Sequence, residues 1–376
     1  MAIKEDVSPQ AFHKLVVDQA TFNDRTWIAI DSNGYPHVAY VMLSSSGGSD
    51  VYYVKYAKWT GTNWFVENPY ITAIGEINKD FPTISFALDT SNNPHICYTQ
   101  MISSSEEDVM YASWNGNSWD IQTVDNNKSK KGRMSLAIDD LNIPHISYDD
   151  VGSLVVKYAV WNGNGWDKEI VEDTGSFLYS SLCIDKKRFP HICYSDFSAS
   201  PTYFLKYANW TGNGWDYSEI DTPDPVTGSM ALGGNGNPQV FYSWYHTNEV
   251  KYAKRIGTQW NTERIDIGAW PLGETIAVDS NNNPHVIYNL IRGDAYLTYA
   301  YNTGSGWKNE SIEDLGGGAS IAIDKNDKIH IFYGCIVANE MRYATNSSIG
   351  TPEFIVVIII PIVLIILFIL VKKYKK

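Results

Sequence analysis

The amino-acid sequence predicts an all-β protein: a seven-bladed β-propeller with four-stranded blades, followed by one C-terminal transmembrane helix. Three observations predict the ring. An Asp-x5-His pair recurs along the chain. A Lys-Tyr-Ala strand recurs after it and leads into a Trp-x-Gly-x-x-Trp turn, called the Trp corner below. An N-terminal segment matches a strand that the last repeat lacks. The repeats follow one another at roughly 50 residues, a period typical of propeller blades that bury their faces only against their neighbours.

The first half of each repeat is a hairpin marked by the Asp-x5-His pair. Two short apolar runs flank an Asn/Gly-rich turn, and Pro starts the second run in six of seven copies. Alternating apolar residues predict strands, and Asn and Gly suit tight turns. The copy with Gly233 also carries Gln239, so we expect Asp and His to form a hydrogen bond that braces the turn. The pairs are Asp31/His37, Asp89/His95, Asp139/His145, Asp185/His191, Asp279/His285 and Asp324/His330.

The second half of each repeat is a strand of the Lys-Tyr-Ala type that ends in a Trp corner. We expect these Trp side chains to staple the hairpin between the third and fourth strands, rather than to form a carbohydrate-stacking array. The seventh copy, at residues 342–348, stops without a Trp corner or a fourth strand. The other copies span residues 55–64, 110–119, 157–166, 206–215, 251–260 and 298–307.

The missing fourth strand is predicted at the other end of the chain. Residues 12–19 match residues 166–173 position by position. We therefore expect residues 12–18 to pair with the strand around Met341–Ala344 and to complete the seventh blade. A ring closed in this way exposes no sheet edge, which protects it from aggregation. One propeller domain is predicted over residues 8–346.

Composition narrows the classes of partner. Hydrophobic residues make up 44% and aromatic residues 14% of the chain, enough for a series of packed sheets. The net charge of −13 argues against nucleic-acid binding, which needs clustered Lys and Arg. A single Asp and His per turn supply too few ligands for a metal, and no cofactor motif is present. Four cysteines are too few for a disulfide scaffold, although Cys183 and Cys193 flank one turn and a disulfide there is one alternative.

Candidate binding residues lie in the irregular segments, because loops on a rigid scaffold carry most binding chemistry. The loops between second and third strands, and those between blades, share one face and vary most. Aromatic side chains beside carboxylates suit sugars or a polar protein. We expect an exposed ligand-binding set there: Trp244, Tyr245, His246, Trp270, Tyr179, Asp196, Asp149 and Asp150.

These observations favour a binding or adhesion protein for glycans or envelope proteins, and not an enzyme. The main alternative is a glycan-active hydrolase or lyase that uses carboxylates of the variable face. Glycoside hydrolysis needs two carboxyl groups at a set separation of about 5–9 Å, and sequence spacing does not place any pair so. A purely structural envelope component is the third possibility.

The C-terminal segment predicts a membrane anchor. Residues 354–371 are uncharged and apolar, and at about 1.5 Å per residue they span about 27 Å, close to the thickness of a bilayer core. Residues 347–353 form a linker, and residues 372–376 form a basic tail with four Lys. Positive charge on the cytoplasmic side predicts a single-pass protein of the cell membrane with the propeller outside and the C-terminus inside.

Pro352, Glu353 and Phe354, followed by an apolar helix and a basic cluster, resemble the PEF-CTERM sorting signal of archaeal surface proteins. The resemblance covers about the last 25 residues. It implies that an archaeosortase-type membrane transpeptidase recognises and processes this motif. In that family a further Pro commonly follows the Phe, whereas this chain has Ile355.

Overall fold

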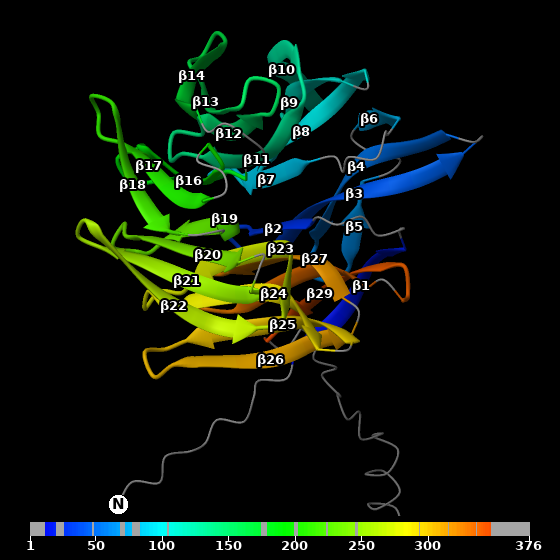
Figure 1. The fold of residues 1–376 in the computed structure, drawn as a ribbon. Helices are drawn as coiled ribbons and strands as arrows, with labels where there is room; N and C mark the ends of the chain where they lie inside the picture. The colour runs from blue at the N-terminus through cyan, green and yellow to red at the C-terminus, as the bar shows by residue number, and fades with distance from the viewer. Residues whose placement is uncertain are drawn as a thin grey trace, which may run out of the picture.

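The protein is a seven-bladed ring in the computed structural model, as the repeats predict (Figure 1). The structure describes residues 12–19, 26–46, 49–67, 72–76, 83–103, 105–173, 179–198, 202–222, 225–244, 247–292, 294–314, 316–335 and 337–346. These residues form seven antiparallel sheets. The innermost strands contact one another in the order β2, β7, β11, β15, β19, β23, β27 and back to β2, so the ring is closed.

Each blade adds its strands in chain order from the axis outward. Blades one to three contain β2 (Thr26–Ile30), β3 (Pro36–Ser46), β4 (Ser49–Trp59), β5 (Trp64–Val66), β6 (Thr72–Glu76); β7 (Ile84–Leu88), β8 (Pro94–Ser103), β9 (Glu106–Trp114), β10 (Trp119–Ser129); β11 (Lys131–Ile138), β12 (Pro144–Asp150), β13 (Val155–Trp161), β14 (Trp166–Asp173). Blades four to six contain β15 (Ser181–Ile184), β16 (Pro190–Asp196), β17 (Phe204–Trp210), β18 (Trp215–Asp221); β19 (Pro225–Leu232), β20 (Pro238–Trp244), β21 (Glu249–Ile256), β22 (Gln259–Ile267); β23 (Ala269–Val278), β24 (Pro284–Arg292), β25 (Asp294–Asn302), β26 (Trp307–Asp314). Blade seven contains β27 (Gly316–Ile323), β28 (Ile329–Cys335), β29 (Glu340–Thr345) and β1 (His13–Gln19).

The predicted closure of the ring is confirmed. β1 pairs antiparallel with β29, with Leu15 opposite Tyr343. Side chains reinforce the pairing, because Lys14 Nζ lies 3.2 Å from Glu313 and Gln19 donates to Glu340 at 3.0 Å. Strands from both ends of the chain therefore share one sheet, and the edge of β29 is covered.

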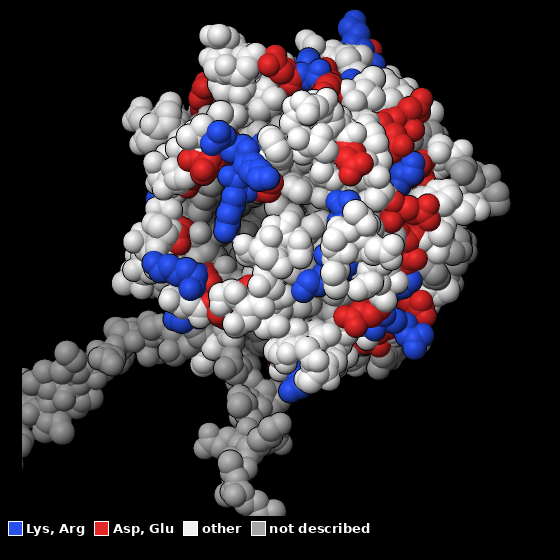
Figure 2. Space-filling view, turned by 90° about the vertical axis from the view of Figure 1, so that its left-hand side faces the viewer, with Lys and Arg blue, Asp and Glu red and all other residues white. Residues whose placement is uncertain are grey.

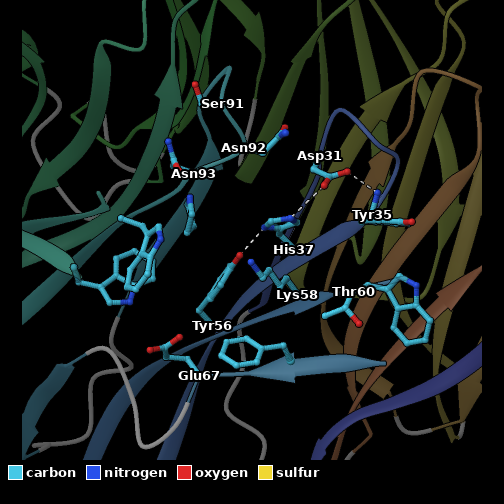
Figure 3. Close-up of a pocket in the computed structure, with 15 residues that line it drawn as sticks. Asp31, Tyr35, His37, Tyr56, Lys58, Thr60, Glu67, Ser91, Asn92 and Asn93 are labelled. Atoms are coloured by element: carbon cyan, nitrogen blue, oxygen red, sulfur yellow. Dashed lines mark hydrogen bonds and ion pairs between the residues drawn. The ribbon is translucent and has the colours of Figure 1, made fainter. Parts of the chain in front are cut away.

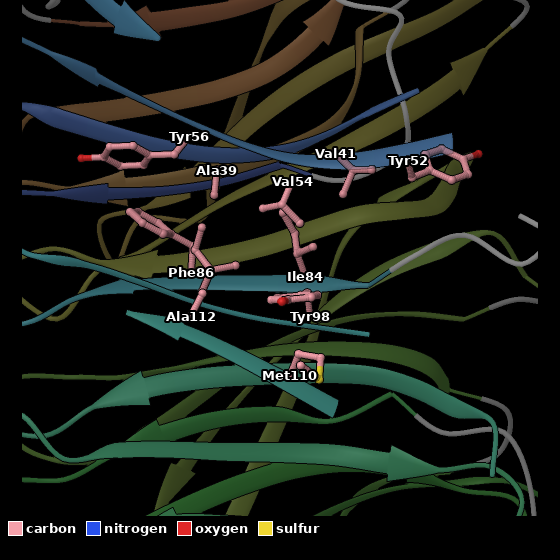
Figure 4. Packing of buried hydrophobic residues seen from close by; sticks show 11 residues of the cluster. Ala39, Val41, Tyr52, Val54, Tyr56, Ile84, Phe86, Tyr98, Met110 and Ala112 are labelled. Carbon is pink, nitrogen blue, oxygen red and sulfur yellow. The ribbon is translucent and has the colours of Figure 1, made fainter. Parts of the chain in front are cut away.

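Packing between neighbouring blades makes the core. Blades one and two bury Val54 and Tyr56 against Ile84, Phe86 and Tyr98 (Figure 4). Equivalent clusters fill the other interfaces, and many of their residues are fully buried. This arrangement explains why both faces of the inner strands are apolar in the sequence.

The Trp corners staple their hairpins, as expected, and they also join the blades. Within a hairpin the two Trp rings lie edge to face, as in Trp114 and Trp119 at 5.6 Å between centroids. The second Trp of each corner also meets the strand-three Tyr of the preceding blade. Phe12 takes this place in the seventh blade. The pairs are Trp64–Tyr343, Trp119–Tyr56, Trp166–Tyr111, Trp215–Tyr158, Trp260–Tyr207, Trp307–Tyr252 and Phe12–Tyr299.

The Asp-x5-His turn is braced differently from the expectation. Asp31 Oδ1 accepts the backbone N–H groups of Asn33 and Tyr35 at 2.8 Å. The imidazole Nε2 of His37 lies 3.7 Å from Asp31 Oδ2, which is long for a hydrogen bond. The short bond of His37 joins its Nδ1 to the hydroxyl of Tyr56 at 2.6 Å. The carboxylate thus holds the turn, while the histidine ties strand two to strand three.

Two further expectations meet the structure here. All four cysteines are free. The expected alternative, a disulfide between Cys183 and Cys193, does not form, because Cys193 lies opposite Ser181 and Cys183 lies opposite His191 in the hairpin register. Among the described residues no helix is long and apolar enough to cross a membrane. The predicted span 354–371 and the motif Pro352–Phe354 lie outside the described residues.

Candidate ligand pocket

The acids expected on the variable face are buried, which corrects their predicted exposure. Asp149 and Asp150 are fully buried and Asp196 is 3% exposed. Asp150 pairs with Lys157 at 2.7 Å, and Asp196 pairs with Lys206 at 2.6 Å. Strand two extends through these positions instead of ending before them, so the side chains lie within the sheet.

The lysine partners belong to a repeated polar contact that the sequence did not reveal. The Lys of the Lys-Tyr-Ala strand and a strand-two Tyr both reach a carboxylate at the end of the preceding outer strand. Asp18, for example, accepts from the Tyr40 hydroxyl at 2.6 Å and from Lys55 at 2.8 Å. Burial and the negative charge of Asp18 raise the pKa of Tyr40 far above its usual value, so its hydroxyl stays protonated. The equivalent acids are Asp125, Glu172 and Asp221, which also receive a lysine, Glu313, which receives Arg342 instead, and Asp266, where Thr298 takes the place of the lysine.

The aromatic members of the predicted set lie on several elements and are not brought together by a described contact. Tyr179 lies beside β15, and its ring faces Arg133 at 3.8 Å from the guanidinium carbon. Trp244 ends β20 and Trp270 belongs to β23, but their side chains are outside what the structure describes. Tyr245 and His246 lie outside the described residues altogether. A ligand role for this set stays a prediction.

The structure instead shows a pocket of about 770 Å³ between blades one and two (Figure 3). It opens beside the Asp/His turns and the Trp corners, the face opposite the one predicted to bind. Blade one supplies its Asp/His turn, parts of β3, β4 and β5 and its Trp corner, and blade two supplies a turn and its Trp corner. The lining residues are Asp31, Tyr35, His37, Tyr56, Lys58, Trp59, Thr60, Phe65, Glu67, Ser91, Asn92, Asn93, Pro94, Trp114 and Trp119.

Strand register builds the blade-one wall of this pocket. His37 pairs with Lys58, and Lys58 pairs with Phe65, so these side chains form one row across three strands. Tyr56 and Glu67 lie opposite each other two positions further along β4, on the same face of the sheet, and the Glu67 N–H donates to the Tyr56 carbonyl at 2.8 Å. In Figure 3 the labelled Glu67 and Tyr56 lie at one side of the pocket and Asp31 at the other.

The outer strand of blade one is interrupted at this pocket. β5 ends at Val66 and β6 begins at Thr72, and both pair with β4, whereas the outer strand of blade two runs unbroken from Trp119 to Ser129. Asn68-Pro69 follows Glu67 in the sequence, and Pro cannot donate to a strand ladder. That dipeptide was the available sequence signal for a break in the blade.

The polar groups of the pocket differ in protonation and pairing. Burial lowers the pKa of His37 to about 4, so this imidazole is neutral near pH 7. Lys58 is exposed and Glu67 is half-buried. The indole Nε1 of Trp119 is buried without a hydrogen-bond partner among the described residues. Aromatic faces therefore lie beside one ammonium, two carboxylates and an indole donor, an arrangement that suits a polyhydroxylated ligand.

The surface around the pocket is mixed in charge. Figure 2 shows the side of the ring that lies at the left of Figure 1, where the third-to-fourth-strand hairpins lie. Lys and Arg are interspersed with Asp and Glu on this face, and more of the acidic side chains lie toward one edge. No broad field of one sign covers this face, so a ligand there would meet local groups of both signs.

Comparison with known proteins supports the fold. No protein-family model and no curated protein matches the sequence. Solved structures match well. A polysaccharide lyase, an ulvan lyase bound to GlcA(1-4)Rha3S, is 11% identical with a TM-score of 0.60, covering 88% of this chain and 95% of that one. A protein of unknown function from Dyadobacter fermentans is 10% identical with a TM-score of 0.54, covering 89% and 98%.

A lectin is also similar in structure. The Aleuria aurantia lectin in complex with Fucα1-6GlcNAc is 14% identical with a TM-score of 0.50, covering 77% of this chain and 95% of that one. At these identities the likeness shows the β-propeller fold and leaves the chemistry to the site.

The expectation that the protein is not an enzyme is wrong, because a polysaccharide lyase has the same architecture and enzymatic activity is therefore plausible for this fold. Repetition of a scaffold motif does not exclude catalysis, because activity belongs to a site on the scaffold and not to the fold.

Proposed function

We propose that the protein recognises a carbohydrate and that the pocket between blades one and two holds it. The observation that carries the proposal is the pocket itself, which is lined by the exposed rings of Phe65 and Tyr35 together with the charged side chains of Glu67 and Lys58. Sugars present apolar faces to aromatic rings and hydroxyl groups to carboxylates and amides. Two neighbours of the same fold, a lectin and a polysaccharide lyase, were solved with bound saccharides, which supports the choice of ligand class.

A glycan array followed by titration calorimetry tests this proposal. We expect the variant Tyr35→Ala with Phe65→Ala to lose at least about tenfold in affinity, since stacked aromatic anchors contribute on the order of 1–3 kcal/mol. Tyr217→Ala is the matched control, because Tyr217 is similarly exposed but lies on blade four. Equal affinity of the folded double variant and wild type would contradict this location.

The variable face is the second candidate location. The variant Trp244→Ala with Trp270→Ala belongs in the same titration, because these residues are the aromatic centre of the set predicted from the sequence. Loss of binding in this variant alone would place the ligand on that face. Product analysis of the bound glycans, by the appearance of unsaturated or reducing ends, distinguishes a binding protein from a lyase or hydrolase.

We propose further that residues 354–371 anchor the protein in the cell membrane, with the propeller outside. The uncharged length of this segment and the Lys residues after it support the proposal. The motif Pro352–Phe354 supports processing by an archaeosortase-type enzyme in an archaeal host. Mass spectrometry of the mature C-terminus tests the processing, and recovery of a peptide that runs through residue 376 would contradict it.

A further inference from the structure

The interface between blades one and two lacks a contact that three other interfaces have, and the indole N–H groups of Trp64 and Trp215 are likewise buried without a partner among the described residues. Where the contact is present, the indole N–H of the second corner Trp donates to the side chain three residues after the second corner Trp of the preceding blade. Trp166 donates to Gln122 at 3.3 Å, Trp260 donates to Ser218 at 3.1 Å, and Trp307 donates to Glu263 at 2.9 Å. This position of the outer strand therefore lies within reach of the next blade's indole.

Glu67 occupies the same position before Trp119, yet no bond joins them. Glu67 lies three residues after Trp64, and Trp119 Nε1 is buried without a partner among the described residues. Both residues line the pocket. The pocket has thus opened between a donor and an acceptor that face each other elsewhere in the ring.

We propose that a hydroxyl of a neutral sugar bridges these two groups, and that the pocket selects neutral glycans over uronate or sulfated ones. The proposal rests on the proposed function and names its ligand class. A hydroxyl donates to the Glu67 carboxylate and accepts from the Trp119 N–H at the same time. A carboxylate or a sulfate only accepts, so neither makes both bonds.

Charge leads to the same selection. Asp31 and Glu67 are carboxylates and Lys58 is the ammonium, so the pocket lining carries a formal charge of 1 − 2 = −1 with His37 neutral. Asp31 already accepts two backbone N–H groups, whereas the Glu67 side chain makes no hydrogen bond among the described residues. An anionic sugar placed at the indole would meet the Glu67 charge at close range, where repulsion is only weakly screened.

The decisive variants are Trp119→Phe and Glu67→Gln. Phe12 already packs on Tyr299 at the position that corresponds to Trp119, with 5.4 Å between ring centroids, so a Phe fits this interface. We expect Trp119→Phe to weaken binding of a neutral glycan about tenfold, because one hydrogen bond is lost. Trp166→Phe removes the same type of N–H outside the pocket and should leave binding unchanged.

Glu67→Gln keeps an acceptor and removes the charge. We expect it to weaken neutral-glycan binding severalfold and to raise the affinity for uronate-containing glycans relative to wild type. The probes are neutral oligosaccharides and the matching uronate and sulfated ones on one array. Wild-type binding to anionic glycans alone, or an unchanged affinity in Trp119→Phe, would overturn this inference and leave carbohydrate recognition intact. Absence of binding to any glycan by folded wild type would overturn the proposed function itself.

Discussion

The buried histidines of the Asp-x5-His pairs make the fold sensitive to acid. Burial lowers the pKa of His37 and of His330 to about 4, and it lowers the pKa of the other four as well. Between pH 6.5 and pH 4 the unfolded chain binds protons that the folded chain does not. The free energy of unfolding therefore falls as the pH falls through this window, by on the order of 3 kcal/mol for His330 at its lower end.

His330→Gln tests this sensitivity. Blade five already carries Gln239, whose Oε1 accepts from the Tyr252 hydroxyl at 2.5 Å, so Gln can replace the bond between His330 and Tyr343. We expect a small cost at pH 7 and a smaller loss of stability between pH 7 and pH 4.5. Urea unfolding at both values measures this. A pH dependence identical to that of wild type would contradict a neutral buried imidazole.

The shared carboxylates give a second prediction at the residue scale. Asp221 receives the Tyr242 hydroxyl at 2.6 Å and the Lys251 ammonium, and the Asp and Lys side chains are 15% and 13% exposed. We expect Asp221→Asn to cost about 3 kcal/mol, since it leaves a largely buried ammonium without its carboxylate. Asp266 is the control, because Thr298 replaces the lysine opposite Tyr288 in that blade.

Asp266→Asn should cost only about 1 kcal/mol, because the amide oxygen of Asn still accepts from the Tyr288 hydroxyl and the Asn309 side chain. Chemical denaturation of both variants gives the comparison. Equal losses in the free energy of unfolding would mean that the ion pair between Lys251 and Asp221 does not stabilise the fold.

At the scale of elements, β1 is the strand on which closure depends. It covers the edge of β29 and buries Val17 against Ile28 and Tyr343. Deletion of residues 1–19 should lower the melting temperature and promote oligomers through the exposed edge of β29. Deletion of residues 1–11 alone is the control and should change neither. Differential scanning calorimetry and size-exclusion chromatography report both effects, and a monomer of unchanged stability would refute closure by this strand.

At the scale of the whole molecule, the pocket and the end of the ring share a face. β29 ends with Thr345 opposite His330, at the Asp/His turns, and the pocket opens beside the equivalent turns of blades one and two. Residues 347–353 extend at most about 25 Å. If residues 354–371 anchor the chain, the pocket therefore faces the cell's own surface and the variable loops point outward.

Protease treatment of intact cells tests this orientation. We expect the propeller to be cleaved from outside while the Lys-rich tail is spared, and a tag placed in the variable loop at residues 47–48 to be accessible to antibody. Cleavage of the propeller only after lysis would place it in the cytoplasm instead.

The sequence alone determined the parts of this protein that are local and repeated. Blade number, strand order, hairpin turns and the closing strand follow from a two-residue alternation and from the return of Asp, His, Pro and Trp at fixed spacing. A strand's periodicity acts within a few residues, so it can be recognised without knowing the neighbours.

Only the tertiary structure decided which groups meet across a blade interface. The sequence pattern places Asp150 and Asp196 in variable loops. In the structure strand two continues through them, and lysines of strand three form ion pairs with their carboxylates. Glu67 and Trp119 lie 52 positions apart (119 − 67), and both line the pocket between blades one and two. Such contacts depend on the stacking of one sheet on the next, and no short-range pattern in the chain encodes that geometry.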